Sequence, residues 1–264
     1  MDSDGFAVDT MDVKHKRCFG PCMVAEWGLQ QWEQPILDRW NEINLYTMTR
    51  GINRFKGLAM ALEEISAQYT PVEGVEVLRE WTETAGELSN AALEAECART
   101  GSPILQKALA WSKAVNRAIG ELPWEVKKAF PGVREAFAAA KDFADIAVVS
   151  SANRDAVEEE WERFGLLRLV DLLLCQDAGS KAYCIGELKK KGYAADHILM
   201  TGDAPGDESA AEVNGVLYFP ILVSHEAESW RLFLNDALPR FRGGEYAGAY
   251  QQERRAAFRA NLGL

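Results

Sequence analysis

The sequence predicts an α/β protein in which a Rossmann-like parallel sheet carries helices on both faces and a separate helical segment is inserted into it. Two observations predict this fold class. From about residue 131 onward, apolar runs of about five residues alternate with segments of helical length, which is typical of a parallel sheet covered on both faces. Residues 20–124 instead repeat their apolar positions every three or four residues, which is the period of an amphipathic helix.

Four short apolar runs mark the predicted strands of the sheet. They lie at residues 145–151, 170–175, 197–203 and 215–221. Helices over Arg154–Phe164 and Lys181–Lys191 are expected to connect them, since both segments are polar and long enough for about three helical turns. Two more helices are predicted after Glu226, with an aromatic and apolar face that docks on the sheet or on a partner. This face consists of Tyr246, Tyr250, Phe258 and Leu262.

The helical segment lies inside the α/β part of the chain. It is punctuated by breakers such as Pro71 and Gly101, which indicate roughly five helices. The N-terminus has no helical period, and its acidic turn is expected to belong to the sheet. The predicted domains are therefore an α/β core of residues 1–19 and 125–264 and an inserted helical segment of residues 20–124.

The composition is that of an ordinary globular protein, with 48% hydrophobic and 26% charged residues among 264. A net charge of −11 argues against nucleic acid as the main partner, because a phosphate backbone is bound mainly through Lys and Arg. No run approaches the ~18 apolar residues of a membrane span, and the first ten residues contain three acids and no base, unlike a signal peptide. We therefore expect a cytoplasmic protein that binds neither nucleic acid nor membrane, with its five cysteines as reduced thiols.

The predicted α/β core contains two acidic clusters. Asp2 and Asp4 are two residues apart, so that both side chains can point the same way from extended backbone, and Gly5 follows them. Asp203 and Asp207 follow an apolar run and precede a helix, which is where a parallel sheet presents its ligand site. Carboxylates at such a strand end suit a hard cation such as Mg²⁺, whereas the alternative is an acidic turn that favours the helix N-terminus.

Two other strand ends carry polar groups that suit an anion. Ser150 and Ser151 end the first predicted strand of the second half, before a turn whose backbone N–H groups can bind an anion. Lys181 begins the next helix, where a cation is unfavourable for the helix itself, so an external anionic partner is expected. Together the strand ends offer a nucleophile, phosphate donors and a metal cage.

These residues make the chain resemble the haloacid dehalogenase superfamily, most of whose members are magnesium-dependent phosphohydrolases. Asp2-Ser3-Asp4-Gly5 is similar to its first motif, Ser150 to the second, Lys181 to the third, and Gly202-Asp203 with Asp207 to the fourth. The motifs occur in the family's order. The helical segment lies between the first and second motifs, where the subfamily with a helical (C1-type) cap over the site carries it.

The resemblance implies chemical roles for the first motif. Asp2 would attack phosphorus to form an aspartyl-phosphate, with its other oxygen on Mg²⁺. Asp4 would protonate the leaving oxygen and later activate the hydrolytic water, with its backbone carbonyl on the metal. The expected protein is a phosphatase, a phosphoric monoester hydrolase that acts on a small phosphorylated metabolite.

The resemblance implies that the residues of the other three motifs bind the phosphoryl group and Mg²⁺. Ser150 and Lys181 would hold and neutralise the transferring phosphoryl oxygens, with Ser151 as a neighbouring phosphate contact. Asp203 would ligate Mg²⁺, and Asp207 would do so directly or through water.

Two features depart from the family pattern. Phe6 follows Gly5 where the family usually has Thr or Val, which places a bulky ring beside the catalytic turn. The family also has a central strand ahead of the first motif, and only Met1 precedes Asp2 here. The first core strand is therefore expected to be missing upstream, and a misassigned start is our hypothesis for its absence.

The helical segment offers candidate substrate contacts and leaves alternatives open. Arg50 and Arg54 flank a turn between two predicted helices and could grip an anionic substrate through bidentate hydrogen bonds. A sugar-phosphate mutase is one alternative, and a phosphonate hydrolase, which would need a lysine such as Lys56, is a second. A non-catalytic binding descendant is the third. The chain is expected to be a monomer or a homodimer.

Overall fold

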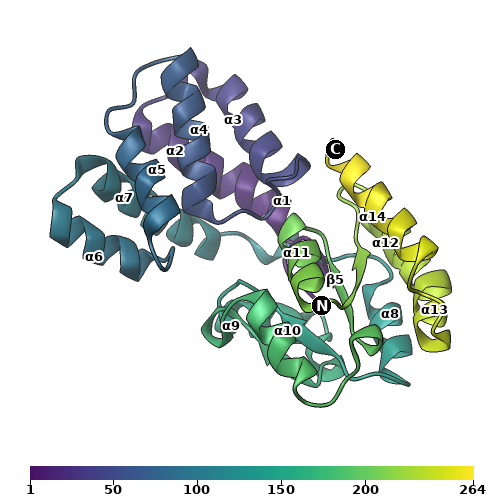
Figure 1. The fold of residues 1–264 in the computed structure, drawn as a ribbon. Coiled ribbons are helices and arrows are strands. Elements are labelled where there is room, and N and C mark those ends of the chain that lie inside the picture. Colours follow the sequence, from purple (N-terminus) through teal and green to yellow (C-terminus); the bar gives the residue numbers. More distant parts are fainter. The chain divides into compact units, whose positions relative to one another are not determined.

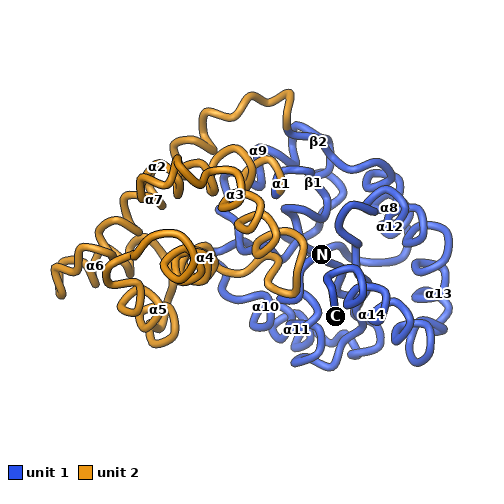
Figure 2. The backbone as a smooth tube through the Cα atoms, turned by 90° about the horizontal axis from the view of Figure 1, so that it is seen from above, with its two compact units in different colours: residues 1–11, 127–264 blue, residues 12–126 orange.

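The computed structural model describes residues 1–264, which divide into two compact units. The α/β unit comprises Met1–Met11 and Lys127–Leu264, and the helical unit comprises Asp12–Val126; Figure 2 colours them separately. The sequence placed the divisions after residues 19 and 124. The structure starts the helical unit earlier because helix α1 (Met11–Lys14) continues through a π-helical turn at His15–Phe19 into helix α2.

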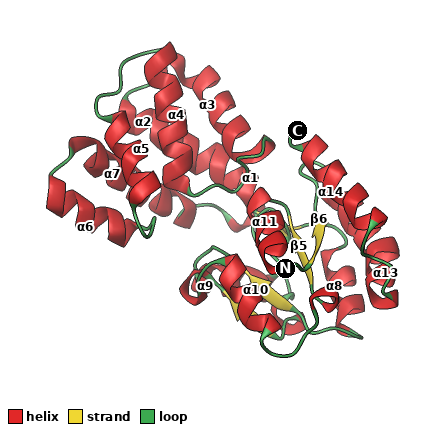
Figure 3. Cartoon of the chain, in the orientation of Figure 1, coloured by secondary structure: helices red, strands yellow, loops and turns green.

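The α/β unit contains two pairs of parallel strands, which appear as the longer arrows in Figure 3. Strand β3 (Ala147–Val149) pairs with β4 (Leu172–Leu174), and β5 (Leu199–Gly202) pairs with β6 (Leu217–Pro220). Each strand lies inside one of the four apolar runs and is shorter than the run. The runs of β4 and β5 begin in turns rather than strand, which shortens these two elements at their N-terminal ends.

Residues Met1 and Asp2 lie between these two pairs. The Met1 amino group donates to the Ala147 carbonyl, at 2.8 Å, and the Met1 carbonyl accepts from the Val149 amide, at 2.7 Å. On the other side, the Asp2 amide donates to the Thr201 carbonyl, at 3.0 Å. The first residues of the chain therefore occupy the position between β3 and β5 where the family resemblance expected a strand.

Helices cover the strands in two groups, and this arrangement confirms the predicted α/β fold class. Buried side chains of α8, α9 and α12 form one hydrophobic core together with Phe6 and β6, whereas α10 packs against α11 outside that core. Figure 1 shows α11 and α8 on opposite sides of β5. The helices of this unit are α8 (Val133–Lys141), α9 (Arg154–Arg163), α10 (Lys181–Lys189), α11 (Pro205–Asn214), α12 (Glu226–Leu232), α13 (Leu238–Gly243) and α14 (Ala249–Asn261).

The C-terminal aromatic face docks on the sheet. Tyr246, Phe258 and Leu262 are buried, and the Tyr246 hydroxyl donates to the Tyr218 carbonyl in β6, at 2.7 Å. The ring of Phe258 meets the ring of Tyr218 edge to face, with centroids 5.7 Å apart. The sequence left open whether this face packs against the sheet or against a partner, and these three side chains pack against the sheet.

A short antiparallel pair connects the two crossings of the chain between the units. Strand β1 (Val8–Asp9) pairs with β2 (Lys128–Ala129), so the segment that leaves the α/β unit lies beside the segment that returns to it. This pairing is long-range, since it joins residues near 8 with residues near 129. It explains how a helical insertion can be accommodated without separating the first motif from the rest of the sheet.

The helical unit has six longer helices, one more than the rough number expected. Its core is aromatic and includes Trp40, Phe55 and Trp111, which are fully buried. Gly101 and Pro103 separate the last two helices, since Gly101 takes the left-handed conformation that ends one helix and Pro103 begins the next. The helices are α2 (Gly20–Trp27), α3 (Glu33–Asn41), α4 (Arg54–Gln68), α5 (Val75–Thr84), α6 (Asn90–Thr100) and α7 (Pro103–Gly120). None of the helices in either unit has the length and apolar character that crossing a membrane requires.

Candidate active site

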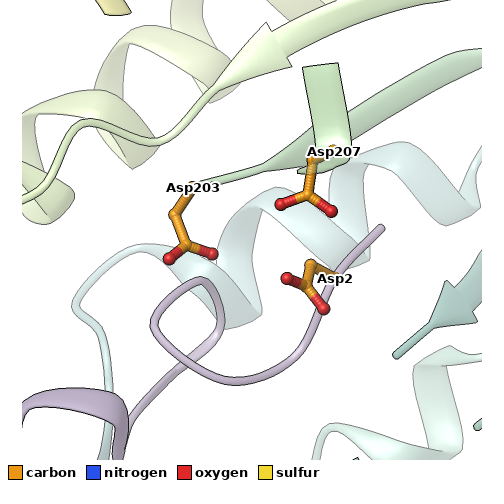
Figure 4. Close-up of side chains that lie close together, drawn as sticks. All are labelled: Asp2, Asp203 and Asp207. Atoms are coloured by element: carbon orange, nitrogen blue, oxygen red, sulfur yellow. The ribbon is translucent and has the colours of Figure 1, made fainter. Parts of the chain in front are cut away.

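Three buried aspartates converge in the α/β unit. Asp2, Asp203 and Asp207 each offer a carboxylate oxygen, and these oxygens lie within 4.8 Å of one another. Figure 4 shows the three side chains facing a common space. Asp2 is held beside β5 by its backbone hydrogen bond, Asp203 follows the end of β5, and Asp207 lies in the first turn of α11. Parallel strands present their carboxyl ends at one edge, which is why residues about 200 positions apart meet here.

The turn between β5 and α11 is shaped to hold Asp207 in place. The Asp207 Oδ2 atom accepts from the Ala204 amide, at 3.1 Å, and the Asp207 amide donates to the Ala204 carbonyl, at 2.9 Å. Gly202 allows this close approach, since a Cβ atom at that position would lie 2.2 Å from Cγ of Asp207. Glycine at position 202 is therefore a steric requirement of the acidic turn.

Lys181 bridges two of the three aspartates. Its Nζ atom lies 2.6 Å from Oδ2 of Asp2 and 2.5 Å from Oδ1 of Asp207. Burial alone would lower the pKa of Lys181, but the charges and hydrogen bonds of Asp2 and Asp207 outweigh burial and raise this pKa above its ordinary value. These two carboxylates favour the charged form of Lys181, and its external anionic partner stays a prediction.

One lysine does not compensate three buried carboxylates. Burial first, and then the neighbouring charge of Asp207, raise the pKa of Asp2 to about 8, although Lys181 acts in the opposite direction. A divalent cation among the three oxygens would reverse this penalty, because hard cations prefer carboxylate ligands. The donor set, all oxygen and buried, therefore fits Mg²⁺, which Asp2, Asp203 and Asp207 would hold.

Asp4 lies outside this group of three. Its Oδ1 atom accepts a hydrogen bond from the Thr10 hydroxyl, at 3.0 Å. The chain makes a tight turn at residues 3–7, in which the Ala7 amide donates to the Ser3 carbonyl, at 2.9 Å. Gly5 in this turn has a φ of +74°, which favours glycine. Asp2 and Asp4 are thus placed by the same turn but in different surroundings.

Two tryptophans that sequence reasoning missed fix this turn. The indole N–H of Trp161 donates to the Ser3 hydroxyl, at 2.8 Å, and that of Trp230 donates to the Phe6 carbonyl, at 3.1 Å. Phe6, which the sequence placed beside the catalytic turn, is fully buried with its ring 4.8 Å from the ring of Trp230. The bulky residue of the motif is therefore an anchor in the hydrophobic core.

Changing Trp161 to Phe is expected to lower the free energy of unfolding by about 1–3 kcal/mol more than the loss of ring volume alone, because the buried Ser3 hydroxyl loses its donor. Chemical denaturation measures the change. Trp40→Phe is the matched control, since Trp40 is equally buried and its indole nitrogen has no hydrogen-bond partner. Equal losses in the two variants would show that the Trp161 hydrogen bond contributes nothing.

The two candidate serines are placed differently after β3. Ser150 is buried, its amide donates to the Leu174 carbonyl, at 2.8 Å, and its hydroxyl oxygen accepts from the Ala152 amide, at 3.1 Å. Ser151 is exposed. Because Val149 bonds to Met1, Ser150 follows the strand that neighbours Asp2. Phosphate binding by either serine stays a prediction.

The candidate residues of the helical unit have roles inside that unit. Arg50 is only 3% exposed and donates to the Leu45 carbonyl, at 2.8 Å. Arg54 donates to Asn116, at 2.7 Å, and its guanidinium lies over the ring of Phe19. Lys56 is exposed on α4. The Arg50 side chain is buried in its own loop, which the sequence did not indicate.

Comparison with known proteins settles the family. The profile of the haloacid dehalogenase-like hydrolase family matches residues 81–220, more than half of the chain. The chain belongs to this family. The match covers the whole of β3, β5, α10 and α11. It includes five of the predicted site residues, namely Ser150, Ser151, Lys181, Asp203 and Asp207. The resemblance inferred from the motifs is thereby confirmed, and the protein is a hydrolase of the haloacid dehalogenase-like type.

Solved structures similar to this chain share little of its sequence, and one of them exceeds a TM-score of 0.5. A provisionally assigned phosphoglycolate phosphatase from Lactobacillus delbrueckii subsp. bulgaricus has a TM-score of 0.51 and 13% identity, covering 100% of this chain and 97% of that one. A haloacid dehalogenase-like hydrolase from Streptococcus pneumoniae has a TM-score of 0.49 and 12% identity, covering 89% of each chain. A provisionally assigned beta-phosphoglucomutase from Thermotoga maritima has a TM-score of 0.45 and 16% identity, covering 98% and 96%. A search of curated proteins finds no match.

Proposed function

We propose that this hydrolase is a Mg²⁺-dependent phosphatase that cleaves a small phosphate ester through an aspartyl-phosphate on Asp2. The observation that carries the proposal is the buried group of Asp2, Asp203 and Asp207 with Lys181 bonded to two of its members. Family membership and the phosphatase assignment of a structural neighbour support the same chemistry.

The first half of the reaction uses Asp2 and Asp4. A carboxylate oxygen of Asp2 attacks phosphorus, the bond from phosphorus to the ester oxygen breaks, and the leaving oxygen takes a proton from Asp4. In the second half a water attacks the phosphorus of the aspartyl-phosphate and gives its proton to Asp4. Inorganic phosphate leaves and the Asp2 carboxylate is restored.

The surrounding residues position and neutralise the phosphoryl group. Lys181 and Ser150 would hold its oxygens, and positioning with charge neutralisation supplies most of the rate of phosphoryl transfer. Bound Mg²⁺ would add positive charge next to the phosphoryl oxygens. The hydrogen bond from Thr10 orients the carboxyl group of Asp4.

Hydrolysis of p-nitrophenyl phosphate tests the proposal. We expect turnover with Mg²⁺ and its loss when EDTA removes the cation, followed by recovery when Mg²⁺ is restored. A panel of phosphorylated metabolites then identifies the substrate class, and exchange between sugar-phosphate isomers in the same panel would reveal a mutase. Absence of turnover across the panel together with absence of Mg²⁺ binding by calorimetry would overturn the proposal and favour a non-catalytic binding protein.

A further inference from the structure

An ion pair with a buried carboxylate joins the C-terminal helix to the acidic turn. Glu208 follows Asp207 in the first turn of α11 and is only 4% exposed. Two arginines of α14 approach it: Arg259 at 3.2 and 3.4 Å through both carboxylate oxygens, and Arg255 at 3.8 Å. A carboxylate removed from water in this way requires a charged partner, so the position of Glu208 depends on α14.

Glu208 lies on the same helical turn as a proposed cation ligand. Asp207 and Glu208 are adjacent, and the Asp207 side chain caps the turn through the Ala204 amide. A shift of this first turn would therefore move the Asp207 carboxylate relative to Asp2 and Asp203. The oxygens of the three aspartates lie within 4.8 Å of one another, so a displacement of about 1 Å is large for a ligand set.

Helix α14 also supports the other end of the acidic turn, indirectly through Tyr218 of β6. The Tyr218 hydroxyl donates to the Gly202 carbonyl, at 3.2 Å, immediately before Asp203. Tyr218 is held by α14 in turn, because the Gln251 side chain accepts from its amide, at 2.9 Å, and Phe258 packs against its ring. Helix α14 therefore supports residues 202–208 at both ends, through Tyr218 and through Glu208.

We propose that Glu208, held by Arg259, is a positioning residue that fixes the acidic turn for cation binding. The proposal rests on the proposed function only in assuming that Asp2, Asp203 and Asp207 bind a divalent cation. Glu208 contacts neither substrate nor cation. Its effect passes through the backbone of the first turn of α11 to Asp207.

A long-range effect of charge on cation binding predicts a different result from the positioning role, so an experiment can distinguish the two. If only charge mattered, removing the negative Glu208 would weaken cation binding and removing the positive Arg259 would strengthen it. If position matters, both changes weaken binding, since either one breaks the same ion pair. The sign of the Arg259 effect therefore distinguishes the two explanations.

Calorimetric titration of the full chain with Mg²⁺ tests the proposal. Glu208→Gln and Arg259→Gln are each expected to weaken Mg²⁺ affinity about tenfold, at the lower end of the loss seen when groups that support metal ligands are removed. The double variant is expected to bind no more weakly than the weaker single variant, because all three variants lose the ion pair between Glu208 and Arg259. Arg254→Gln is the matched control, since Arg254 is on the same helix but pairs with Glu253, and its affinity should stay within about twofold.

The Mg²⁺ titrations distinguish failure of the positioning role of Glu208 from failure of the proposed function. Unchanged or tighter Mg²⁺ binding by Arg259→Gln, with the wild-type chain binding normally, would overturn the positioning role while leaving the proposed function intact. No Mg²⁺ binding by the wild-type chain would overturn both. Arg259 is about half-exposed, so this variant keeps the test valid if the change at buried Glu208 disturbs folding, and circular dichroism verifies the fold.

Discussion

Changing Asp2 to Asn is expected to reduce phosphate-ester hydrolysis by a factor on the order of 10³ to 10⁶, because the amide is nearly isosteric with the carboxylate but does not attack phosphorus. The fold should persist, since the backbone amide of residue 2 keeps its hydrogen bond to Thr201 and one of three buried like charges is removed. The initial rate with p-nitrophenyl phosphate and saturating Mg²⁺ measures the effect. Asp155→Asn, which removes an exposed carboxylate from α9, should retain wild-type activity.

This variant also separates the nucleophile from the cation site. The asparagine side chain in Asp2→Asn would still offer one oxygen, so weakened Mg²⁺ binding alone should be overcome by higher Mg²⁺ concentrations, whereas loss of the nucleophile should not. Trapping phosphate on the wild-type chain during turnover, followed by its absence in Asp2→Asn, would identify the attacking residue directly. Hydrolysis by Asp2→Asn at the wild-type rate would show that another group attacks phosphorus.

The order of elements in the α/β unit could be predicted because the controlling signals are local. An apolar run followed by a polar helical segment is visible within about 20 residues, and each of β3 to β6 lies in such a run. The positions of Asp203 and Lys181 followed from the same pattern, since both occur at the boundary between an apolar run and a helix. The predicted lengths were less accurate, because turns and strands have similar apolar content at their junctions.

Long-range contacts could not be predicted in the same way. The hydrogen bond from Trp161 to Ser3 joins residues 158 positions apart, and the bond from Trp230 to Phe6 joins residues 224 apart. Neither tryptophan belongs to a motif, and a tryptophan in an apolar stretch indicates only packing. The ion pair of Glu208 with α14 had a weak signal at most, namely an extra acid beside Asp207 and arginines at the end of an otherwise acidic chain.

Replacing Lys181, which bridges Asp2 and Asp207, is expected to have a large effect on stability. Lys181→Met keeps most of the side-chain volume and removes the ion pairs that Lys181 makes with Asp2 and Asp207. In EDTA the variant is expected to lose about 3–5 kcal/mol of unfolding free energy, the usual cost of leaving a buried ion without its partner. Urea denaturation measures this loss, with Lys190→Met as control, because Lys190 on the surface pairs with exposed Glu187 and should cost less than about 1 kcal/mol.

Adding Mg²⁺ should then restore much of the stability of Lys181→Met, because a cation among the three carboxylates replaces the lost positive charge. Binding at about 100 times the dissociation constant stabilises the folded state by about 2.7 kcal/mol. Mg²⁺ should therefore stabilise this variant at lower concentrations than it stabilises the wild-type chain, in which Lys181 competes for Asp2 and Asp207. Activity is expected to remain low even when stability returns, since the phosphoryl oxygens have lost a neutralising contact. A variant that is as stable as the wild-type chain in EDTA and insensitive to Mg²⁺ would contradict both the charge balance and the cation site derived from it.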